Sequence, residues 1–270
     1  VFRQLILCGK IPVTTLDLVY RQGKNSNIAL NAKLMQQGRT DLIEGEDFQM
    51  IACKGAEEAA QIVKELYVKE LAVHGMDQVQ ILSPYKVRSA AGVIEINRTI
   101  QDLVNPPISG KKELHIHDHI FREGDKVLQS NGDMGILTEI SEDEDSNPLA
   151  RIVFPDGRSV LYEADQMDMV EHANAITIHK SQGNECQVVI IPWVWAFYKM
   201  LKRNILYTGI TRAKQKVYLV GEKKAITVAI KQESTGTRNT ILAERIRYYC
   251  DIYQKPTQRQ PKMEQLRLAV

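Results

Sequence analysis

The sequence lacks the features that mark membrane-spanning, secreted and disulfide-stabilised proteins. No apolar run approaches the roughly 18 residues that a membrane span needs, and the opening VFRQLILCGKIPV shows no small-residue cleavage pattern of a secretory signal. The 4 cysteines lie far apart and form no C-x-x-C pair. We therefore expect buried free thiols and a reduced cytoplasm, with no membrane partner, in a chain that begins as if it continued a longer protein.

The sequence also lacks an excess of charge of either sign. Its 35 Lys and Arg residues against 33 Asp and Glu residues give a formal net charge of +2. A nucleic-acid contact must therefore come from a local basic cluster and not from a uniformly basic surface. With 270 residues, 44% of them hydrophobic, the chain is long enough for one large domain with a smaller insertion or for two modest domains.

Short apolar runs that alternate with amphipathic segments predict an α/β fold. Apolar residues at helical spacing predict helices over 26–37 and 56–74, which end at Gly38 and Gly75. The predicted strands are β-rich runs at 49–53, 79–85, 175–179, 188–193 and 217–222. Nearly continuous apolar strands of this kind form a parallel sheet that helices cover on both faces. This is the architecture of nucleotide-driven motors.

The stretch from about 121 to 172 follows a different pattern. It contains short alternating segments joined by the turn sequences NGD, EDEDSNP and PDG. This pattern predicts a small antiparallel barrel inserted into the α/β domain. The acidic EDEDSNP segment is interpreted as a solvated hairpin turn and not a calcium loop, because Pro148 stands where such a loop needs glycine.

The strongest motif is TIHKSQGNE at 177–185, placed where a predicted strand ends. Ligands of open α/β sheets bind beyond the carboxyl ends of strands. The side chains suited to gripping successive phosphates are Thr177, His179, Lys180 and Ser181. Gly183 permits close backbone approach, and Glu185 can accept a hydrogen bond from a ribose hydroxyl. A shorter K-S-x-G loop is as often a plain polar turn with a capping serine, so the prediction depends on the full nine-residue string.

A second motif, YTGITRAK, lies within 204–221. Arg212 is predicted to follow a short helix and to precede a strand, which fixes its guanidinium at the sheet edge. Such a group stabilises the charge on a transferring phosphoryl group, as an arginine finger does. A lone Arg beside a helix usually forms a surface ion pair, so this prediction depends on the surrounding string.

Two further segments complete the set. In VYRQ at 19–22, Tyr20 offers a flat face for an adenine and Arg21 a second cation for a γ-phosphate. In ILSPYKVRSAAGVIEINRTIQDLVNP at 81–106, the loop after the strand is expected to contact the nucleic-acid backbone through Pro84, Tyr85 and Lys86. Asn97 and Gln101 are interpreted as packing positions.

These strings resemble motifs of superfamily 1 helicases. TIHKSQGNE is similar to motif V in its RecD-like form, YTGITRAK to motif VI and VYRQ to motif IV, and FREGDKV with NGDMG is similar to the start of an SH3-like barrel. The chain therefore resembles the C-terminal part of a RecD/TraA-type helicase. The resemblance implies a second RecA-like motor domain of the P-loop NTPase type with an inserted SH3-like β-barrel. The implied divisions are a remnant of the first domain at 1–18, the motor domain at 19–118 and 173–250, the barrel at 119–172 and a flexible tail at 251–270.

The resemblance also implies a function. The intact protein is expected to be an ATP-dependent DNA helicase of 5′-to-3′ polarity, acting in DNA repair or recombination in a bacterial cytoplasm. Its expected partners are single-stranded DNA, single-strand/duplex junctions and its own first RecA-like domain, which would hold ATP with Mg²⁺. No Gly-Lys pair in this chain is followed by Ser or Thr as the phosphate-cradling motif requires, so these 270 residues alone are predicted to be inactive. The alternative is a non-catalytic nucleic-acid-binding or partner module with a helicase fold.

One cluster of histidines and one cluster of aromatic residues suggest a ligand site, but each has a simpler structural explanation. HIHDH would place His115, His117 and His119 on one face of a strand, but further ligands at set positions are lacking, so no metal site is predicted. Trp193, Trp195 and Tyr198 could stack on bases, yet they directly follow an apolar strand. Core or subunit packing is the favoured interpretation for them.

Overall fold

The computed structural model describes residues 2–14, 26–87, 89–232 and 241–253. The chain divides into two compact units. The smaller combines Val1–Val19 with Thr235–Val270, and the larger spans Tyr20–Ser234. The larger unit contains every described position that the sequence predicts to contact a ligand.

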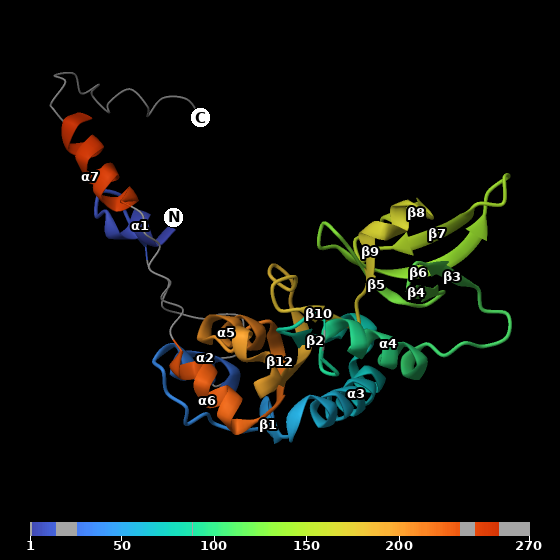
Figure 1. Cartoon of the computed structure of the whole chain (residues 1–270), viewed down its shortest axis with the longest axis horizontal. Helices are drawn as coiled ribbons and strands as arrows, with labels where there is room; N and C mark the ends of the chain where they lie inside the picture. The colour runs from blue at the N-terminus through green and yellow to red at the C-terminus, as the bar shows by residue number, and fades with distance from the viewer. Residues whose placement is uncertain (1, 15–25, 88, 233–240, 254–270) are drawn as a thin grey trace, which may run out of the picture. The chain divides into compact units, whose positions relative to one another are not determined.

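A five-stranded parallel sheet forms the centre of the larger unit (Figure 1). The strands are β1 (Phe48–Ala52), β2 (Val79–Ser83), β10 (Ala175–Thr177), β11 (Cys186–Trp193) and β12 (Ala213–Gly221). Their order is β1-β12-β11-β2-β10, and every neighbouring pair runs parallel. The five predicted apolar runs are thereby confirmed as strands. The sheet is consistent with the predicted RecA-like domain.

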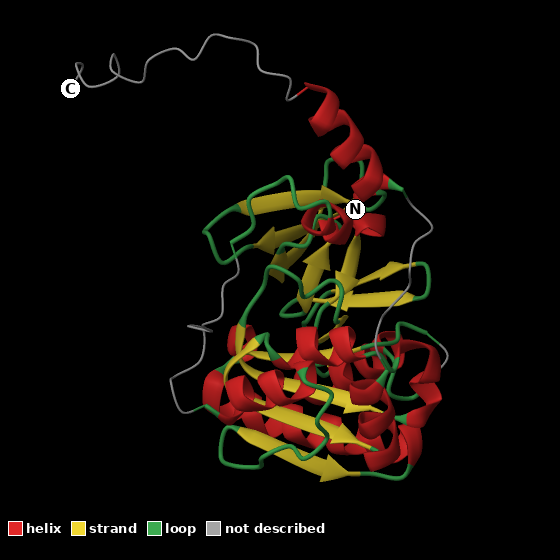
Figure 2. Cartoon of the chain, turned by 90° about the vertical axis from the view of Figure 1, so that its left-hand side faces the viewer, coloured by secondary structure: helices red, strands yellow, loops and turns green. Residues whose placement is uncertain are grey.

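Helices cover both faces of this sheet (Figure 2). The crossovers from β1 to β2 and from β2 to β10 move along the sheet in one direction, and the crossover from β11 to β12 moves back. Because such crossovers are right-handed, their helices lie on opposite faces. One face carries α3 (Gly55–His74) and α4 (Val93–Val104), and the other carries α2 (Asn27–Gln36), α5 (Arg203–Ile210) and α6 (Lys223–Lys231).

The predicted helix ends are also confirmed. The Ser26 hydroxyl accepts a hydrogen bond from the Ile28 backbone N–H at 3.1 Å and caps α2. Helix α3 ends at Gly75, whose φ of 80° is a left-handed conformation that glycine adopts without strain.

A second sheet, antiparallel throughout, is inserted between α4 and β10. Its strand order is β8-β7-β6-β5-β9. The strands are β5 (Lys126–Gln129), β6 (Met134–Glu142), β7 (Pro148–Val153), β8 (Ser159–Glu163) and β9 (Val170–His172). A short 3₁₀ turn, η2 (Gln166–Met169), comes before β9, and another, η1 (Met76–Gln78), comes before β2 of the parallel sheet. NGD, EDEDSNP and PDG all join neighbouring antiparallel strands, as predicted. The inserted antiparallel unit is confirmed, and its likeness to an SH3 barrel stays a prediction.

The inserted sheet has its own apolar core, and buried polar side chains of α4 fix it to the rest of the larger unit. That core includes Phe121, Leu137 and Ile152. Asn97 of α4 donates to the carbonyls of His172 and Ala175 at 3.0 and 2.8 Å and accepts from the Ala175 N–H at 2.7 Å. These bonds confirm the structural role predicted for Asn97.

Gln101 of α4 has the same kind of role. Its side-chain amide donates to the Asp125 carboxylate and to the Ile120 carbonyl, both at 2.7 Å. Asp125 also accepts from Asn105, the residue that ends α4, at 2.7 Å. The turn before β5 is thereby fixed to α4, and the structural role predicted for Gln101 is confirmed.

The HIHDH segment is a hairpin and not one strand. It spans the end of β3 (Glu113–Ile116) and the start of β4 (His119–Arg122), and His117 has a left-handed φ of 51° in the turn between them. The expectation that three histidines share one face of a strand is therefore wrong, because the chain reverses at His117. Among the described residues, no group of three His, Cys, Asp or Glu residues is arranged to hold a metal ion.

The aromatic residues at the end of β11 and directly after it divide between core and surface. Trp193 is fully buried, as core packing requires. In the 3₁₀ segment η3 (Trp195–Met200), Phe197 is buried, whereas Trp195 and Tyr198 are 41% and 60% exposed. Core packing is thus confirmed for Trp193, whereas Trp195 and Tyr198 do not pack in the core, and subunit packing of these two stays a prediction.

The smaller unit pairs two helices from opposite ends of the chain. Helix α1 (Phe2–Leu7) contacts α7 (Leu242–Tyr253). Arg247 donates to the Cys8 carbonyl at 3.0 Å, and Lys10 pairs with Asp251 at 2.5 Å. Contacts thus group α7 with α1, although the sequence divisions had placed residues up to 250 in the motor domain. None of the described helices is long and apolar enough to cross a membrane.

Candidate nucleic-acid interface

The two loops predicted to contact nucleic acid lie beside each other. Strands β2 and β10 are neighbours, and Thr177 stands opposite Ser83 at their carboxyl ends. The Ile178 N–H donates to the Ser83 carbonyl at 3.1 Å. The chain leaves both strands at the same edge of the sheet, where open α/β sheets bind their ligands. Residues 84–86 and 178–180 therefore form one surface, although about ninety positions separate them in the sequence.

The loop after β2 is fixed by backbone hydrogen bonds from the start of α4. The Val93 and Ile94 N–H groups at the start of α4 donate to the carbonyls of Tyr85 and Lys86 at 3.0 and 3.1 Å. The Tyr85 ring stacks on Phe197, with ring centroids 5.5 Å apart and planes at 14°. Pro84 is buried, whereas Lys86 is exposed. The loop thus presents Lys86 and one side of Tyr85 from a fixed backbone.

The loop after β10 is a compact turn with internal hydrogen bonds. The Thr177 hydroxyl accepts from the Lys180 N–H at 3.2 Å, and the Ser181 hydroxyl donates to the Ile178 carbonyl at 2.8 Å. His179 is exposed, but Ser181 is only 3% exposed. A ligand contact from Ser181 or Pro84 therefore requires the loops to open. Gly183 has a φ of 97°, which a residue with a Cβ adopts only under strain.

A carboxylate from the inserted sheet accepts hydrogen bonds from Lys86 and Lys180, the two lysines that are predicted to contact nucleic acid. Glu171 of β9 accepts from the Lys86 Nζ through Oε1 at 3.0 Å and from the Lys180 Nζ through Oε2 at 2.9 Å. Burial pushes the pKa of Glu171 upward, but the hydrogen bonds from Lys180 and Lys86 more than offset it and leave that pKa below its usual value. Glu171 is therefore charged at neutral pH.

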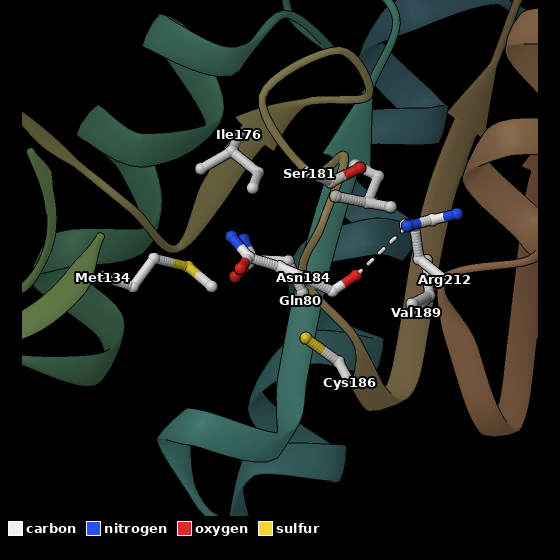
Figure 3. Close-up of a pocket in the computed structure, with 9 residues that line it drawn as sticks. Gln80, Met134, Ile176, Ser181, Asn184, Cys186, Val189 and Arg212 are labelled. Carbon is white, nitrogen blue, oxygen red and sulfur yellow. Dashed lines mark hydrogen bonds between the residues drawn. The ribbon is translucent and has the colours of Figure 1, made fainter. Parts of the chain in front are cut away.

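The second half of the 178–185 loop reaches the opposite end of the sheet. The loop leaves the carboxyl end of β10 and enters the amino end of β11, where the Cys186 N–H donates to the Arg212 carbonyl at 3.1 Å. Arg212 lies between α5 and β12, as predicted. Its guanidinium donates to the Thr208 carbonyl at 3.2 Å and to the Asn184 carbonyl at 3.5 Å (Figure 3).

Further contacts join the motif V and motif VI segments. Glu185 forms an ion pair with Lys214 at 3.2 Å. Asn184 and Arg212 line one small pocket together with Ser181 and Met134, the latter from the inserted sheet (Figure 3). The predicted arginine finger is therefore packed directly against the end of the loop whose beginning carries Thr177 and Lys180. One eight-residue connection, 178–185, links both predicted sites.

Two residues that the sequence predicts to bind nucleotide are not described by the structure, and one residue that contacts both predicted DNA-binding lysines was not predicted. Tyr20 and Arg21 lie outside the described residues. Glu171 gives no signal in the sequence, because it is a single acidic residue on a three-residue strand. Only the folding of β9 against β5, beside the carboxyl ends of β2 and β10, brings it to both lysines.

Comparisons with known proteins agree with the motifs. Residues 172–220 match the family described as the UvrD-like helicase C-terminal domain. This segment runs from the end of β9 to β12 and contains TIHKSQGNE and YTGITRAK. The ATP-dependent RecD2 DNA helicase of Deinococcus radiodurans is 28% identical over 90% of this chain and 33% of its own length. This chain is similar to the RecD-type helicases.

Other relatives extend the comparison. The RecBCD enzyme subunit RecD of Mycolicibacterium smegmatis is 27% identical over 65% of this chain and 30% of its own length. The chain thus spans about a third of the curated RecD-type relatives it matches. The structure of the Bacteroides Pif1 helicase in complex with ADP-AlF3 and single-stranded DNA aligns with 89% of this chain and 57% of that one, at 15% identity and a TM-score of 0.48.

Proposed function

We propose that this chain is the C-terminal motor half of an ATP-dependent DNA helicase of 5′-to-3′ polarity. The observation that carries the proposal is the 178–185 loop, whose first half contains the predicted DNA-contacting residue Lys180 and whose end contacts Arg212. The polarity is taken from the RecD-type resemblance alone. Repair or recombination in a bacterial cytoplasm is the setting that the same resemblance suggests.

The nucleic-acid side of the proposal uses the carboxyl ends of β2 and β10. Lys86, Lys180 and His179 would bind backbone phosphates of single-stranded DNA, with Thr177 at the base of the loop. Tyr85, already stacked on Phe197, offers an aromatic ring at the same surface. Lysines bind phosphate without reading sequence, which suits a motor that moves along any strand. Junctions of single and double strands are the proposed working substrate.

The nucleotide side uses the opposite end of the loop. ATP with Mg²⁺ would be held mainly by a first RecA-like domain, because no Gly-Lys pair here has the phosphate-cradling sequence. Arg212 would stabilise charge on the γ-phosphate, with Arg21 as a second cation and Tyr20 stacked on the adenine. Gly183 would allow close approach of the backbone to the nucleotide, and Glu185 would accept from the ribose.

The link between the two sides would drive movement. Closure of Arg212 on ATP would pull on Asn184, whose carbonyl the guanidinium contacts, and would shift the turn that carries Lys180. The internal hydrogen bonds of the turn make it move as one piece. The grip on DNA would thereby change with each cycle of ATP binding and hydrolysis.

The test is the substitution Arg212→Ala in the full-length enzyme. We expect DNA-stimulated ATP hydrolysis to fall by about 10³-fold or more, as for other arginine fingers, while single-strand binding is largely kept. The control is Arg151→Ala, which removes an equal charge from a surface ion pair with Glu139 on the inserted sheet. Unchanged turnover in the Arg212 variant would contradict the proposal.

A non-catalytic nucleic-acid-binding module is the second candidate. It is favoured by one observation: the lysine-bearing loops are within this chain, whereas no phosphate-cradling Gly-Lys sequence is. An immunoblot of source-cell lysate against the purified 30.7 kDa chain separates the two. A much larger native polypeptide fits the helicase, and one of equal size fits the module or a motor subunit completed by another chain.

A further inference from the structure

Glu171 occupies the space between the two lysines that are proposed to bind DNA. Each of its carboxylate oxygens accepts from a different ammonium, at 3.0 Å from Lys86 and 2.9 Å from Lys180. The three side chains are 35%, 49% and 37% exposed, in the order Glu171, Lys86 and Lys180. The cluster is thus open to solvent and reachable by a polymer, unlike the fully buried ion pairs of a protein core.

The arrangement matches the way two lysines hold a phosphate. A backbone phosphate, like a carboxylate, carries one negative charge shared by two outer oxygens, and each oxygen accepts from a separate cation. Two lysines that converge on one carboxylate therefore converge on a position of the correct size and charge for one phosphate. A phosphate cannot bind both ammonium groups in this geometry while Glu171 is between them.

The backbone around Glu171 does not depend on its side chain. Strand β9 pairs with β5 through the backbone, with Glu171 opposite Leu128. The neighbouring His172 carbonyl accepts from Asn97 at 3.0 Å, and the Ala173 N–H donates to the Lys126 carbonyl at 2.8 Å. Among the described residues, the hydrogen bonds of this carboxylate come from the two lysines alone. Asp125, in the turn before β5, differs because it accepts from Gln101, Asn105 and the Arg122 N–H.

We infer that Glu171 is an internal competitor of DNA: in the free protein its carboxylate fills a phosphate position formed by Lys86 and Lys180, and single-stranded DNA displaces it. The inference rests on the proposed DNA-binding function and adds a regulation of that site. Glu171 lowers the affinity of the resting protein, so the strand is held strongly only where enough phosphates bind together. Because β9 belongs to the inserted sheet, any shift of that sheet that withdraws Glu171 strengthens the grip.

The test compares Glu171→Gln with the wild-type chain. The amide has nearly the same shape but no charge, so both lysines become available. Binding of a fluorescent oligo(dT) strand is measured by anisotropy at several salt concentrations. We expect Kd to fall on the order of three- to tenfold at low salt, since each such partly exposed ion pair changes an equilibrium constant by a small factor. The gain is expected to shrink as salt rises.

A matched control removes the same charge elsewhere. Glu139→Gln breaks the ion pair with Arg151 on the inserted sheet, with 2.8 Å between the charged atoms, and contacts neither Lys86 nor Lys180. If Glu139→Gln tightens binding as much as Glu171→Gln, the effect is one of net charge and the inference is overturned. Weaker or unchanged binding by Glu171→Gln also overturns it, because Glu171 would then position the lysines or be idle.

A double-mutant cycle separates failure of the inference from failure of the proposed function. In the Lys86→Gln/Lys180→Gln background, Glu171→Gln should no longer change Kd, because the position it blocks is gone. If the lysine substitutions weaken binding but Glu171→Gln behaves as its control, only the competitor role fails. If the lysine substitutions leave binding unchanged, DNA does not bind at this edge and both proposals fail.

Discussion

Lys126 is a buried cation whose ammonium donates to neutral oxygens. Its side chain is 2% exposed, and its ammonium donates to the carbonyls of Met76 and Val79 and to Gln80 Oε1 at 2.8, 3.1 and 3.0 Å. Three neutral oxygens stabilise the charge only in part. Burial therefore lowers the pKa of Lys126 from 10.5 to about 8.

This shift predicts that stability rises with pH above neutrality. Below pH 8 Lys126 is protonated in the folded and the unfolded chain, and between about pH 8 and 10.5 only the unfolded chain keeps the proton. The unfolding free energy should therefore gain up to about 3 kcal/mol across that window. Urea unfolding at a series of alkaline pH values measures it.

Lys126→Met provides the comparison. This variant should be less stable at pH 7, because three buried oxygens lose their donor, but it should lack the alkaline gain. Other groups that titrate at alkaline pH contribute equally to the wild-type chain and the variant. One of them is Cys53, whose pKa burial raises to about 11. Parallel stability curves for the two proteins would show that Lys126 titrates normally.

At the level of elements, the strand that carries the nucleic-acid loop is short and depends on a helix. Strand β10 has three residues, and it pairs on one side only, with β2. Asn97 of α4 binds both backbone groups of Ala175, the first residue of β10. Helix α4 thus supplies from a side chain the ladder bonds that an edge strand lacks.

Asn97→Ala should therefore affect both stability and binding. It leaves the carbonyls of His172 and Ala175 and the Ala175 N–H without partners in a buried region, at a cost of about 2–4 kcal/mol. Because the start of β10 is released, we expect oligo(dT) binding to weaken severalfold under conditions where the variant is still folded. Chemical denaturation and anisotropy measure the two effects.

Asn31→Ala is the matched control for this prediction. Asn31 of α2 is likewise fully buried and binds both backbone groups of Ile43, at 2.8 and 2.7 Å. It should lose comparable stability without a change in binding. Equal loss of binding in both variants would mean that general destabilisation, and not the β10 link, is responsible.

Most elements could be predicted because their signals are local. The apolar runs of β2 and β11, the Ser26 cap and the Gly75 stop act within a few residues. HIHDH was misread because alternation of polar and apolar residues fits a strand as well as a hairpin. The left-handed φ at His117 that decides between them is rare for a residue with a Cβ.

For the molecule as a whole, a net charge of +2 cannot attract DNA from all sides. Binding should depend on a few local contacts with phosphates, and the slope of log Kobs against log salt should report how many there are. Lys86→Gln/Lys180→Gln should reduce the slope of log Kobs against log salt by about 0.7, the value for one phosphate contact on a single strand, because the two lysines share one phosphate position.

The control for the slope is Lys69→Gln/Lys112→Gln. Both lysines are exposed, on α3 and before β3, and the substitutions change the net charge equally. Their slope should stay close to that of the wild-type chain, measured with oligo(dT) between about 50 and 200 mM salt. Equal reductions in both variants would show that binding follows overall charge and has no defined site.

The amino-acid sequence was sufficient to predict the five strands of the parallel sheet, the helices α2 and α3, the inserted antiparallel unit and the motif strings, because apolar spacing, turn residues and caps act over short distances. Which of these strings contact one another depends on the long-range pairing of the strands. Parallel pairing of β2 with β10 brought residues 84–86 to 178–180, and pairing of β11 with β12 brought Arg212 to Asn184. The ion pairs of Glu171 arise the same way, since long-range strand order leaves no local trace in a chain.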